Sequence, residues 1–117
     1  MARGDVLLVS LPASDKREQS GRRPAVAIQT DVTGEPMLMI APVTSNLNAL
    51  RFAFAVQIDP SIENGLTESS VIMIFQMRAI DKARIIRKIG QVSSSDLAKI
   101  DDEIWRMLKP PSTDGTN

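Results

Sequence analysis

The chain has 117 residues and no net formal charge, because 14 Lys and Arg balance 14 Asp and Glu; hydrophobic residues make up 43%. It contains no cysteine and no histidine, which excludes disulfides, thiolate metal sites, cysteine nucleophiles and imidazole acid–base chemistry. Any catalysis must therefore rest on carboxylates, hydroxyls, lysine or arginine. The size suits one compact domain, which we place at 1–109, followed by a disordered tail at 110–117.

No apolar run approaches the roughly 20 residues that a membrane-spanning helix needs. The first residues lead directly into a strand-like run and lack the charged and apolar regions of a signal peptide. We therefore expect a cytoplasmic protein without a membrane segment.

The first half of the chain predicts three strands. Apolar runs with the composition of buried strands cover 5–10, 24–30 and 37–43. The polar segment 11–23 is long for so small a domain, and such loops are more often functional than simple connectors. Gly34 and Pro36 indicate a turn. Residues 44–50 are expected to form a loop or a single helical turn.

The second half predicts three more strands. They cover 53–58, 69–76 and 84–92. Gly90 indicates a bulge or bend in the last of them. Between the last two strands, the polar segment 76–84 is expected to be a turn.

The final predicted element is an amphipathic helix. Ser93, Ser94 or Ser95 can cap its N-terminus, and Pro110 ends it. Its apolar residues form one stripe beside Trp105: Leu97, Ile100, Ile104 and Leu108. Strands come first and one helix last, without the alternation of parallel-sheet proteins. The sequence therefore predicts a mainly β (α+β) fold, a small antiparallel barrel with an accessory helix.

The loop before the second strand is the first candidate site. It carries the sequence EQSGRRP over 18–24, with Arg23 beside a proline at the strand start. A guanidinium held in this way matches phosphate oxygens and loses little freedom on binding. The alternative is a solvated charged loop, which the residues alone leave equally open.

Two further polar segments follow apolar strands. Residues 42–46 (PVTSN) present two hydroxyls and an amide, although Thr44 or Ser45 could instead cap the next helical turn. In segment 76–84, Arg78 and Asp81 are spaced to pair locally, and the residues alone favour a structural ion pair in a turn.

In their order and spacing, these segments resemble the MazF/PemK toxin family over about residues 3–108. The matching motifs are Arg3-Gly4-Asp5, the 18–24 loop, Pro42-Val43-Thr44-Ser45 and Gln76-Met77-Arg78-Ala79-Ile80-Asp81. The resemblance implies an SH3-like barrel with a C-terminal helix, assembled as a homodimer. It also implies a toxin that cleaves single-stranded RNA sequence-specifically without metal or cofactor. An antitoxin protein is expected to block the RNA groove with a disordered acidic segment.

Residue by residue, the resemblance assigns catalytic roles to Arg23, Thr44 and Glu18. Arg23 matches the family's catalytic arginine, Thr44 its catalytic hydroxyl residue, and Glu18 an acidic loop residue implicated in activity in some members. The predicted RNA contacts are the polar and basic residues around them: Arg17, Gln19, Arg22, Ser45, Asn46, Gln76 and Arg78. The 2′-hydroxyl of RNA would act as nucleophile and leave a 2′,3′-cyclic phosphate and a 5′-hydroxyl.

The chain departs from some family members just before the glutamine at 76. Those members carry an arginine and an aspartate where this chain has Met73 and Phe75, so their acid and base cannot be transferred. Two alternatives remain: a toxin of the same fold that binds DNA gyrase through the helix bearing Trp105, or an inactive, antitoxin-binding member. Arg23 and Thr44 favour the nuclease, because a gyrase poison needs neither.

The residues that read RNA bases are less clearly indicated. The loops at 12–23 and 59–67 are expected to flank the groove. The aromatic residues Phe52, Phe54 and Phe75 are expected in the core or the dimer interface. Base recognition would then depend on hydrogen bonds to base edges rather than on stacking.

Overall fold

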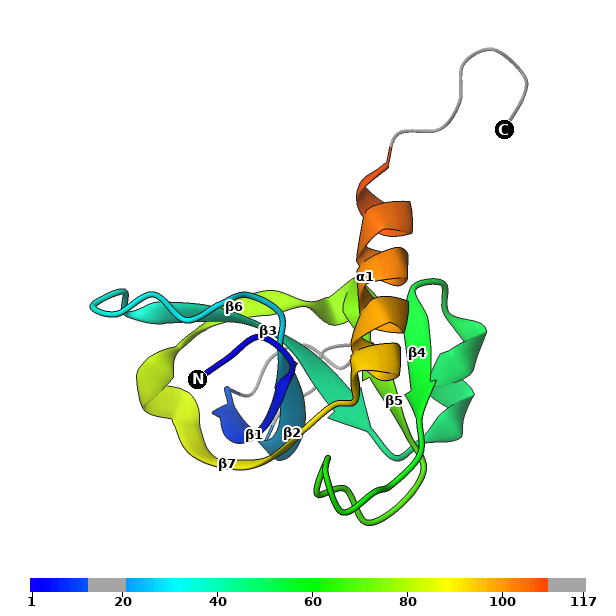
Figure 1. Ribbon diagram of the computed structural model, residues 1–117, viewed down its shortest axis with the longest axis horizontal. Helices are drawn as coiled ribbons and strands as arrows, with labels where there is room; N and C mark the ends of the chain where they lie inside the picture. The colour runs from blue at the N-terminus through cyan, green and yellow to red at the C-terminus, as the bar shows by residue number, and fades with distance from the viewer. Residues whose placement is uncertain (13–20, 110–117) are drawn as a thin grey trace.

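The structure is a computed structural model that describes residues 1–12 and 21–109. Within these residues the chain forms seven strands, three short 3-10 turns and one helix (Figure 1). The strands are β1 (Asp5–Leu11), β2 (Gly21–Ala27), β3 (Met37–Thr44), β4 (Ala55–Ile58), β5 (Ser70–Met73), β6 (Arg78–Asp81) and β7 (Ile85–Gln91). The remaining elements are η1 (Leu47–Arg51), η2 (Ile74–Gln76), η3 (Lys82–Arg84) and α1 (Ser94–Leu108).

The strands form one antiparallel sheet that curves into a partly open barrel. Neighbouring strands pair in the order β4-β5-β3-β2-β1-β7, and β6 also pairs with β3. Two strands pair with the same edge of β3: β6 pairs with Met37–Ile40, and β5 pairs with Val43–Thr44. The turn η3 leads from β6 into β7 and brings the ring back to β1 (Figure 1). The predicted small antiparallel barrel with a C-terminal helix is confirmed.

Strand alternation creates two apolar cores on opposite faces of the sheet. The inner core fills the barrel and consists of Leu7, Val9, Leu11, Ala25, Ala27, Leu38, Ile40 and Ile80. The outer core lies between the sheet and α1, and its buried members include Val6, Val26, Val43, Ile72 and Ile100. β1 contributes to both cores, which explains why its sequence shows little alternation.

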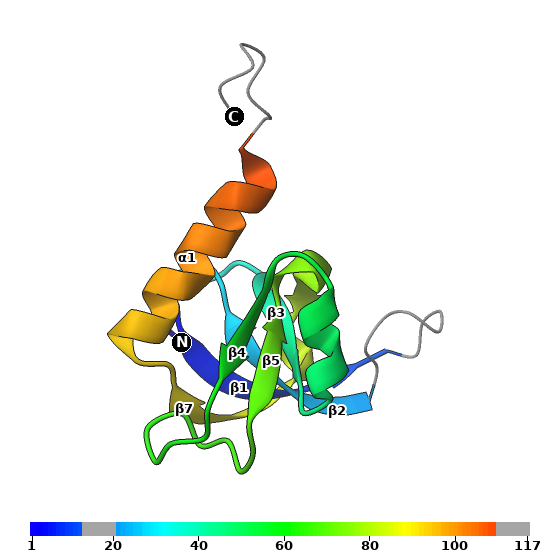
Figure 2. The ribbon, with the colours of Figure 1, turned by 90° about the vertical axis from the view of Figure 1, so that its right-hand side faces the viewer.

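The helix α1 packs one apolar stripe on the outer core. Ser93 caps it by accepting a hydrogen bond from the Asp96 amide at 3.1 Å, as expected for one of the three serines. Ile100 is fully buried, with three partly buried neighbours on the stripe: Leu97, Ile104 and Met107. The prediction for Leu108 is wrong. The last helical turn projects beyond the sheet (Figures 1 and 2), and Leu108 is 64% exposed.

Two predicted strand starts are also shifted. β2 begins at Gly21 rather than at residue 24, because its ladder with β1 continues until Leu11 pairs with Gly21. β4 begins at Ala55 rather than at residue 53. Phe54 has a φ of +61°, in the left-handed region, and this interrupts extended backbone.

The predicted turn at 76–84 is wrong in most of its length. The predicted strand 69–76 ends at Met73, η2 follows, and β6 then pairs with β3 over Arg78–Asp81. Arg78 and Asp81 therefore point to opposite faces of a strand, which separates the expected local ion pair. The Asp81 carboxylate instead caps η3 by accepting from the Ala83 amide at 2.8 Å.

The predicted irregularity at Gly90 is confirmed. Along β1, the partner changes from Gly90 at Val6 to Lys88 at Leu7, so one residue of β7 bulges out. Within the described residues, no helix is long and apolar enough to cross a membrane.

Candidate functional site

Strand pairing brings Arg23 and Thr44 to one end of the barrel. β2 and β3 pair Ala25 with Pro42, and continuing this antiparallel register by two residues brings Arg23 level with Thr44. Arg23 alternates with Ala25, and Thr44 with Ile40, both of which belong to the inner core. Both side chains are therefore directed to the barrel's inner face.

Arg78 contributes to the same face from the opposite side of β3, four residues before the level of Thr44. It pairs with Ile40 and alternates with Ile80, so it also belongs to the inner face. We call the group of Arg23, Thr44 and Arg78 the barrel mouth. Arg23 and Arg78 are half-buried and each has an interaction partner in the structure. The mouth therefore combines a hydroxyl with two half-buried guanidinium groups on one face of the sheet, and Arg78 lies four residues along β3 from the level of Thr44.

The Thr44 side chain forms the floor of the barrel mouth. It is only 7% exposed, and its Oγ1 accepts a hydrogen bond from the Asn46 amide at 3.2 Å. This bond occupies a lone pair, so the hydroxyl hydrogen can be donated to an incoming oxygen. Neither Thr44 nor Ser45 is the cap of η1, contrary to the alternative interpretation. Asn46 is the cap, and its side chain accepts from the Asn48 amide at 3.1 Å.

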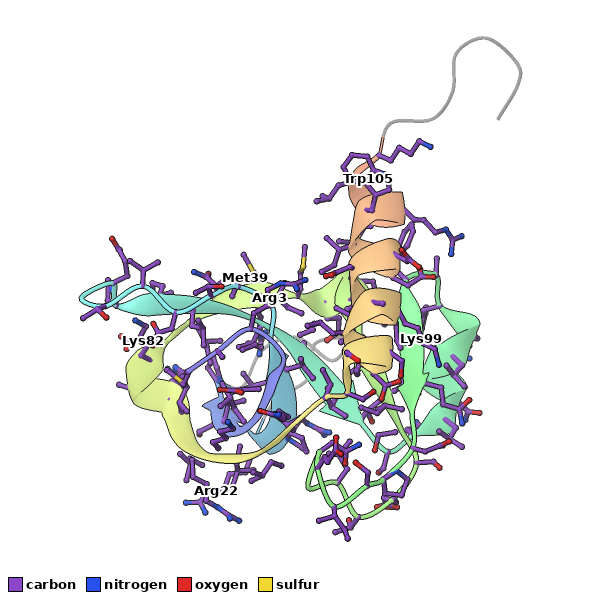
Figure 3. All side chains as sticks on the ribbon, viewed as in Figure 1. Arg3, Arg22, Met39, Lys82, Lys99 and Trp105 are labelled. Carbon is purple, nitrogen blue, oxygen red and sulfur yellow. The ribbon has the colours of Figure 1, made fainter. Side chains whose placement is uncertain are left out.

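The structure describes four of the remaining predicted RNA contacts, and they differ in their settings. Ser45 and Asn46 are exposed where the chain leaves β3, and Gln76 is half-buried at the end of η2 with a partner in the structure. Arg22 alternates with Arg23 and so lies on the opposite face of β2, exposed and pointing away from the body (Figure 3). Arg17, Glu18 and Gln19 lie outside the described residues.

The chemistry available at the mouth is that of an anion site. Guanidinium groups supply fixed positive charge and planar pairs of N–H donors that fit phosphate oxygens. A hydroxyl donor at the floor adds a directional contact. Such a set can hold a phosphodiester and stabilise additional negative charge on it.

Arg51 at the end of η1 is exposed beside Phe52, and it belongs to none of the predicted motifs. The expectation for the aromatic residues is met at Phe54 and Phe75, which pack partly buried against apolar clusters. Phe52 differs, because it is 47% exposed. An Arg-Phe pair directly after a helical turn was the available signal.

A family model and a relative of known name both match almost the whole chain. Residues 2–108 match the family model described as PemK-like, MazF-like toxin of type II toxin–antitoxin system. The Endoribonuclease MazF of Staphylococcus saprophyticus is 33% identical over 106 residues, which cover 89% of this chain and 88% of that protein.

Solved structures share the fold at lower identity. MazF from Deinococcus radiodurans aligns with a TM-score of 0.74 at 23% identity, covering 92% of this chain and 96% of the other. A mycobacterial endoribonuclease in complex with its cognate antitoxin aligns with a TM-score of 0.70 at 17% identity, covering 96% of each chain. With the family match over residues 2–108, this chain belongs to the PemK-like, MazF-like toxins of type II toxin–antitoxin systems.

Proposed function

We propose that this chain is an endoribonuclease that cleaves single-stranded RNA sequence-specifically and without a metal ion. The Staphylococcus saprophyticus relative, which the match covers to 88% of its length, carries the name endoribonuclease. The observation that supports the chemistry is the barrel mouth, where the strand register gives Arg23, Thr44 and Arg78 one common face of the sheet. These groups match the charge and geometry of a phosphodiester.

In the proposed mechanism, the RNA 2′-hydroxyl attacks the adjacent phosphorus and displaces the 5′-oxygen of the next nucleotide. Arg23 binds the phosphorane oxygens, whose added charge it stabilises, and is the candidate proton donor to the leaving oxygen. Thr44 donates its hydroxyl hydrogen to the scissile phosphate and fixes its orientation. The products are a 2′,3′-cyclic phosphate and a 5′-hydroxyl.

Glu18 is the proposed general base that removes the proton from the 2′-hydroxyl. It lies outside the described residues, and the assignment rests on its place in the 18–24 loop. Arginine is unsuited to this role because its guanidinium group stays protonated in proteins and has no lone pair to accept the proton.

We further propose a cytoplasmic homodimer that binds its RNA across both copies and is blocked by an antitoxin. The antitoxin proposal is supported by the mycobacterial structure, which was solved as a complex with its cognate antitoxin. The anion site at the barrel mouth suits an acidic antitoxin segment as well as RNA.

The first experiment is cleavage of a mixed-sequence single-stranded RNA in excess EDTA, with the cut positions and new ends mapped. We expect discrete cuts that leave cyclic phosphate and 5′-hydroxyl ends. Arg23→Ala should lower the rate by about 10²–10³-fold or more, the cost of losing a preorganised oxyanion donor. The matched control is Arg87→Ala, because Arg87 is an exposed arginine on β7. Full activity in a folded Arg23→Ala protein would contradict the assignment.

The absence of histidine gives a separate prediction for the pH dependence of cleavage. The rate should show no imidazole inflection near about pH 6.5. Any limb there must come from a carboxylate with a shifted pKa, and Glu18→Gln should remove it. An unchanged profile of the rate against pH in Glu18→Gln would exclude Glu18 as the base.

One observation favours the alternative toxin that binds DNA gyrase. Trp105 is 66% exposed near the projecting end of α1 (Figure 3), where a partner protein can reach it. Induced expression separates the two functions, because a nuclease degrades cellular RNA whereas a gyrase poison produces DNA breaks. An inactive member, the reading that Met73 and Phe75 support, would leave growth unaffected.

A further inference from the structure

Two exposed side chains and one half-buried ring form an aromatic and cationic surface beside η1. The Phe52 and Phe75 ring centroids are 5.1 Å apart with an interplanar angle of 41°, and the Arg51 guanidinium carbon lies 4.9 Å from the Phe52 ring centroid. We call Arg51, Phe52 and Phe75 the aromatic ledge. Phe52 is 47% exposed, so much of its ring surface remains in contact with water.

The aromatic ledge lies on the same side of the sheet as the barrel mouth. Thr44 pairs with Val71 of β5, and residues directly opposite in an antiparallel pair share one face. On that face Val71 and Met73 form a small buried cluster with Ala49 of η1, and Phe75 packs against it. The other face of β5 belongs to the outer core under α1. Figure 2 shows α1 on one side of the β4–β5 hairpin and the coil of η1 on the other.

The chain also connects the ledge to the mouth at two points. The segment from Thr44 leads through the Asn46 cap directly into η1, whose last residue is Arg51. Phe75 immediately precedes Gln76, and Arg78 begins the next strand. The Phe75 amide donates to the Phe54 carbonyl at 3.2 Å, which ties η2 to the chain just beyond Phe52. The ledge therefore borders the anion site rather than lying on a separate surface.

An exposed phenylalanine with an arginine over its ring is suited to an unpaired nucleobase. Every base has a π face that can stack on an aromatic ring or on a guanidinium plane, whatever its hydrogen-bonding edge. The positive charge of Arg51 is complementary to the phosphates on either side of that base. A single-stranded RNA whose phosphate occupies the barrel mouth would bring a neighbouring base to the ledge.

We propose that the aromatic ledge is a stacking subsite for one unpaired base of the RNA, next to the scissile phosphate. This inference rests on the proposed function and adds a residue pair, Phe52 and Arg51, that positions the substrate. It adds a stacking contact to the base-edge hydrogen bonds on which sequence recognition is expected to depend. A second copy of the chain is the competing occupant of this apolar surface, and the test below separates the two.

The test compares four substitutions in the full-length protein, with thermal melts to establish that each is folded. We expect Phe52→Ala to lower kcat/KM by about tenfold through KM, the loss expected for one stacked base. Phe52→Trp should retain activity, whereas Phe52→Leu should fall with Phe52→Ala. The matched control is Leu50→Ala, because Leu50 is 40% exposed on the same turn but has no ring.

Stacking is measured directly with an RNA that cannot be cut. The scissile nucleotide carries a 2′-deoxy substitution, and 2-aminopurine replaces each flanking base in turn. The wild type and Phe52→Trp should quench fluorescence at one position, and Phe52→Ala should not. RNA that binds without position-specific quenching overturns the ledge and leaves the nuclease proposal standing. If the protein quenches the fluorescence but never cuts RNA that carries the 2′-hydroxyl, the stacking subsite is supported and the nuclease proposal is wrong. If the protein does not bind RNA at all, both proposals are wrong.

Sedimentation equilibrium tests the competing occupant. The association state should be the same for the wild type, Phe52→Ala and Leu50→Ala. If Phe52→Ala and Leu50→Ala weaken self-association equally, the surface is an interface between copies and the proposal is wrong. The proposal is also wrong if Phe52→Leu cleaves as well as the wild type, because no aromatic ring is then needed.

Discussion

The Thr44 side chain has a local structural role and also faces the barrel mouth. Its Oγ1 accepts the Asn46 amide at 3.2 Å, which orders the exit from β3 just before η1. The side chain is 7% exposed, so its hydroxyl is held in one place rather than solvated. A group fixed before substrate arrives costs little entropy when it binds the phosphate. The two roles can be separated by substitution.

Thr44→Val keeps the shape of the side chain but removes the oxygen. We expect kcat to fall by about 10- to 100-fold, since a hydrogen bond to a charged group contributes about 1.5–3 kcal/mol. The free energy of unfolding should fall by about 1 kcal/mol, because the Asn46 amide loses its acceptor. Thr44→Ser should recover most of the lost kcat and most of the lost free energy of unfolding. Steady-state cleavage and urea denaturation measure them, and a fully active Thr44→Val would remove Thr44 from the mechanism.

At the scale of elements, the connection between β4 and β5 packs closely against β7 and is hydrogen-bonded to it. Asn64 is 2% exposed and holds the connection together: its Oδ1 accepts from the Ser61 and Leu66 amides, and its Nδ2 donates to the Asp59 carbonyl at 2.8 Å. The Gln91 amide donates to the Glu63 carbonyl at 2.8 Å. The two backbones approach so closely that a Cβ on Gly65 would lie 2.1 Å from the Ile89 carbonyl oxygen. The predicted 59–67 loop is therefore a rigid part of the fold.

Gly65 and Gly34 separate two reasons for a glycine: close contact with another backbone and a positive φ angle. Gly65 and Gly34 both have positive φ, at +72° and +90°, but a Cβ on Gly34 meets nothing within 4 Å. Gly34→Ala should cost about 1–2 kcal/mol of unfolding free energy, from conformation only. Gly65→Ala adds the clash with β7 and should cost about 3 kcal/mol or more. Chemical denaturation measures both, and equal losses would show that the contact with β7 is unimportant.

At the scale of the whole molecule, contacts distant in sequence close both sides of the fold. Arg3 forms an ion pair with Asp101 of α1 and donates from Nε to the Ile28 carbonyl at 2.8 Å. Asp31, in the connection between β2 and β3, forms an ion pair with Lys82 of η3. The Lys82 amide also donates to the Pro36 carbonyl at 2.8 Å. These contacts fasten the helix and the β6–β7 corner to the first half of the chain.

The Asp31–Lys82 pair should make stability depend on pH in the acid range. The hydrogen bond from Lys82, and then its charge, lowers the pKa of Asp31 below its ordinary value. The pair's contribution is therefore present above about pH 4 and is lost as pH falls through the lowered pKa. The stability difference between wild type and Asp31→Asn should shrink over this window. Glu35→Gln, in the same connection, is the control, and a difference independent of pH would contradict the prediction.

How much of the fold the sequence predicts depends on whether the signal is local. Local patterns predict the antiparallel barrel, the final helix and its serine cap. These patterns are runs of apolar residues and the polar residues that separate them, and each acts within a few residues. The errors fall where distant pairing decides. Gly21–Arg23 is polar yet extended because β1 provides a ladder for it, and Arg78–Asp81 is a strand because β3 offers a free edge. Leu108 lies beyond the sheet that its stripe was expected to cover.

The class of fold, the chemistry available without histidine or cysteine, and the family motifs that contain Arg23 and Thr44 all follow from the order of amino acids. Which side chains share a face depends on how the strands pair. Adjacent residues in a strand point to opposite sides, so Arg22 and Arg23 separate, whereas Arg23, Thr44 and Arg78 share one face although they come from three strands. The tertiary structure also placed Phe52 and Phe75 in contact beside the mouth. Register and packing arise between segments distant in the chain, and no local pattern encodes them.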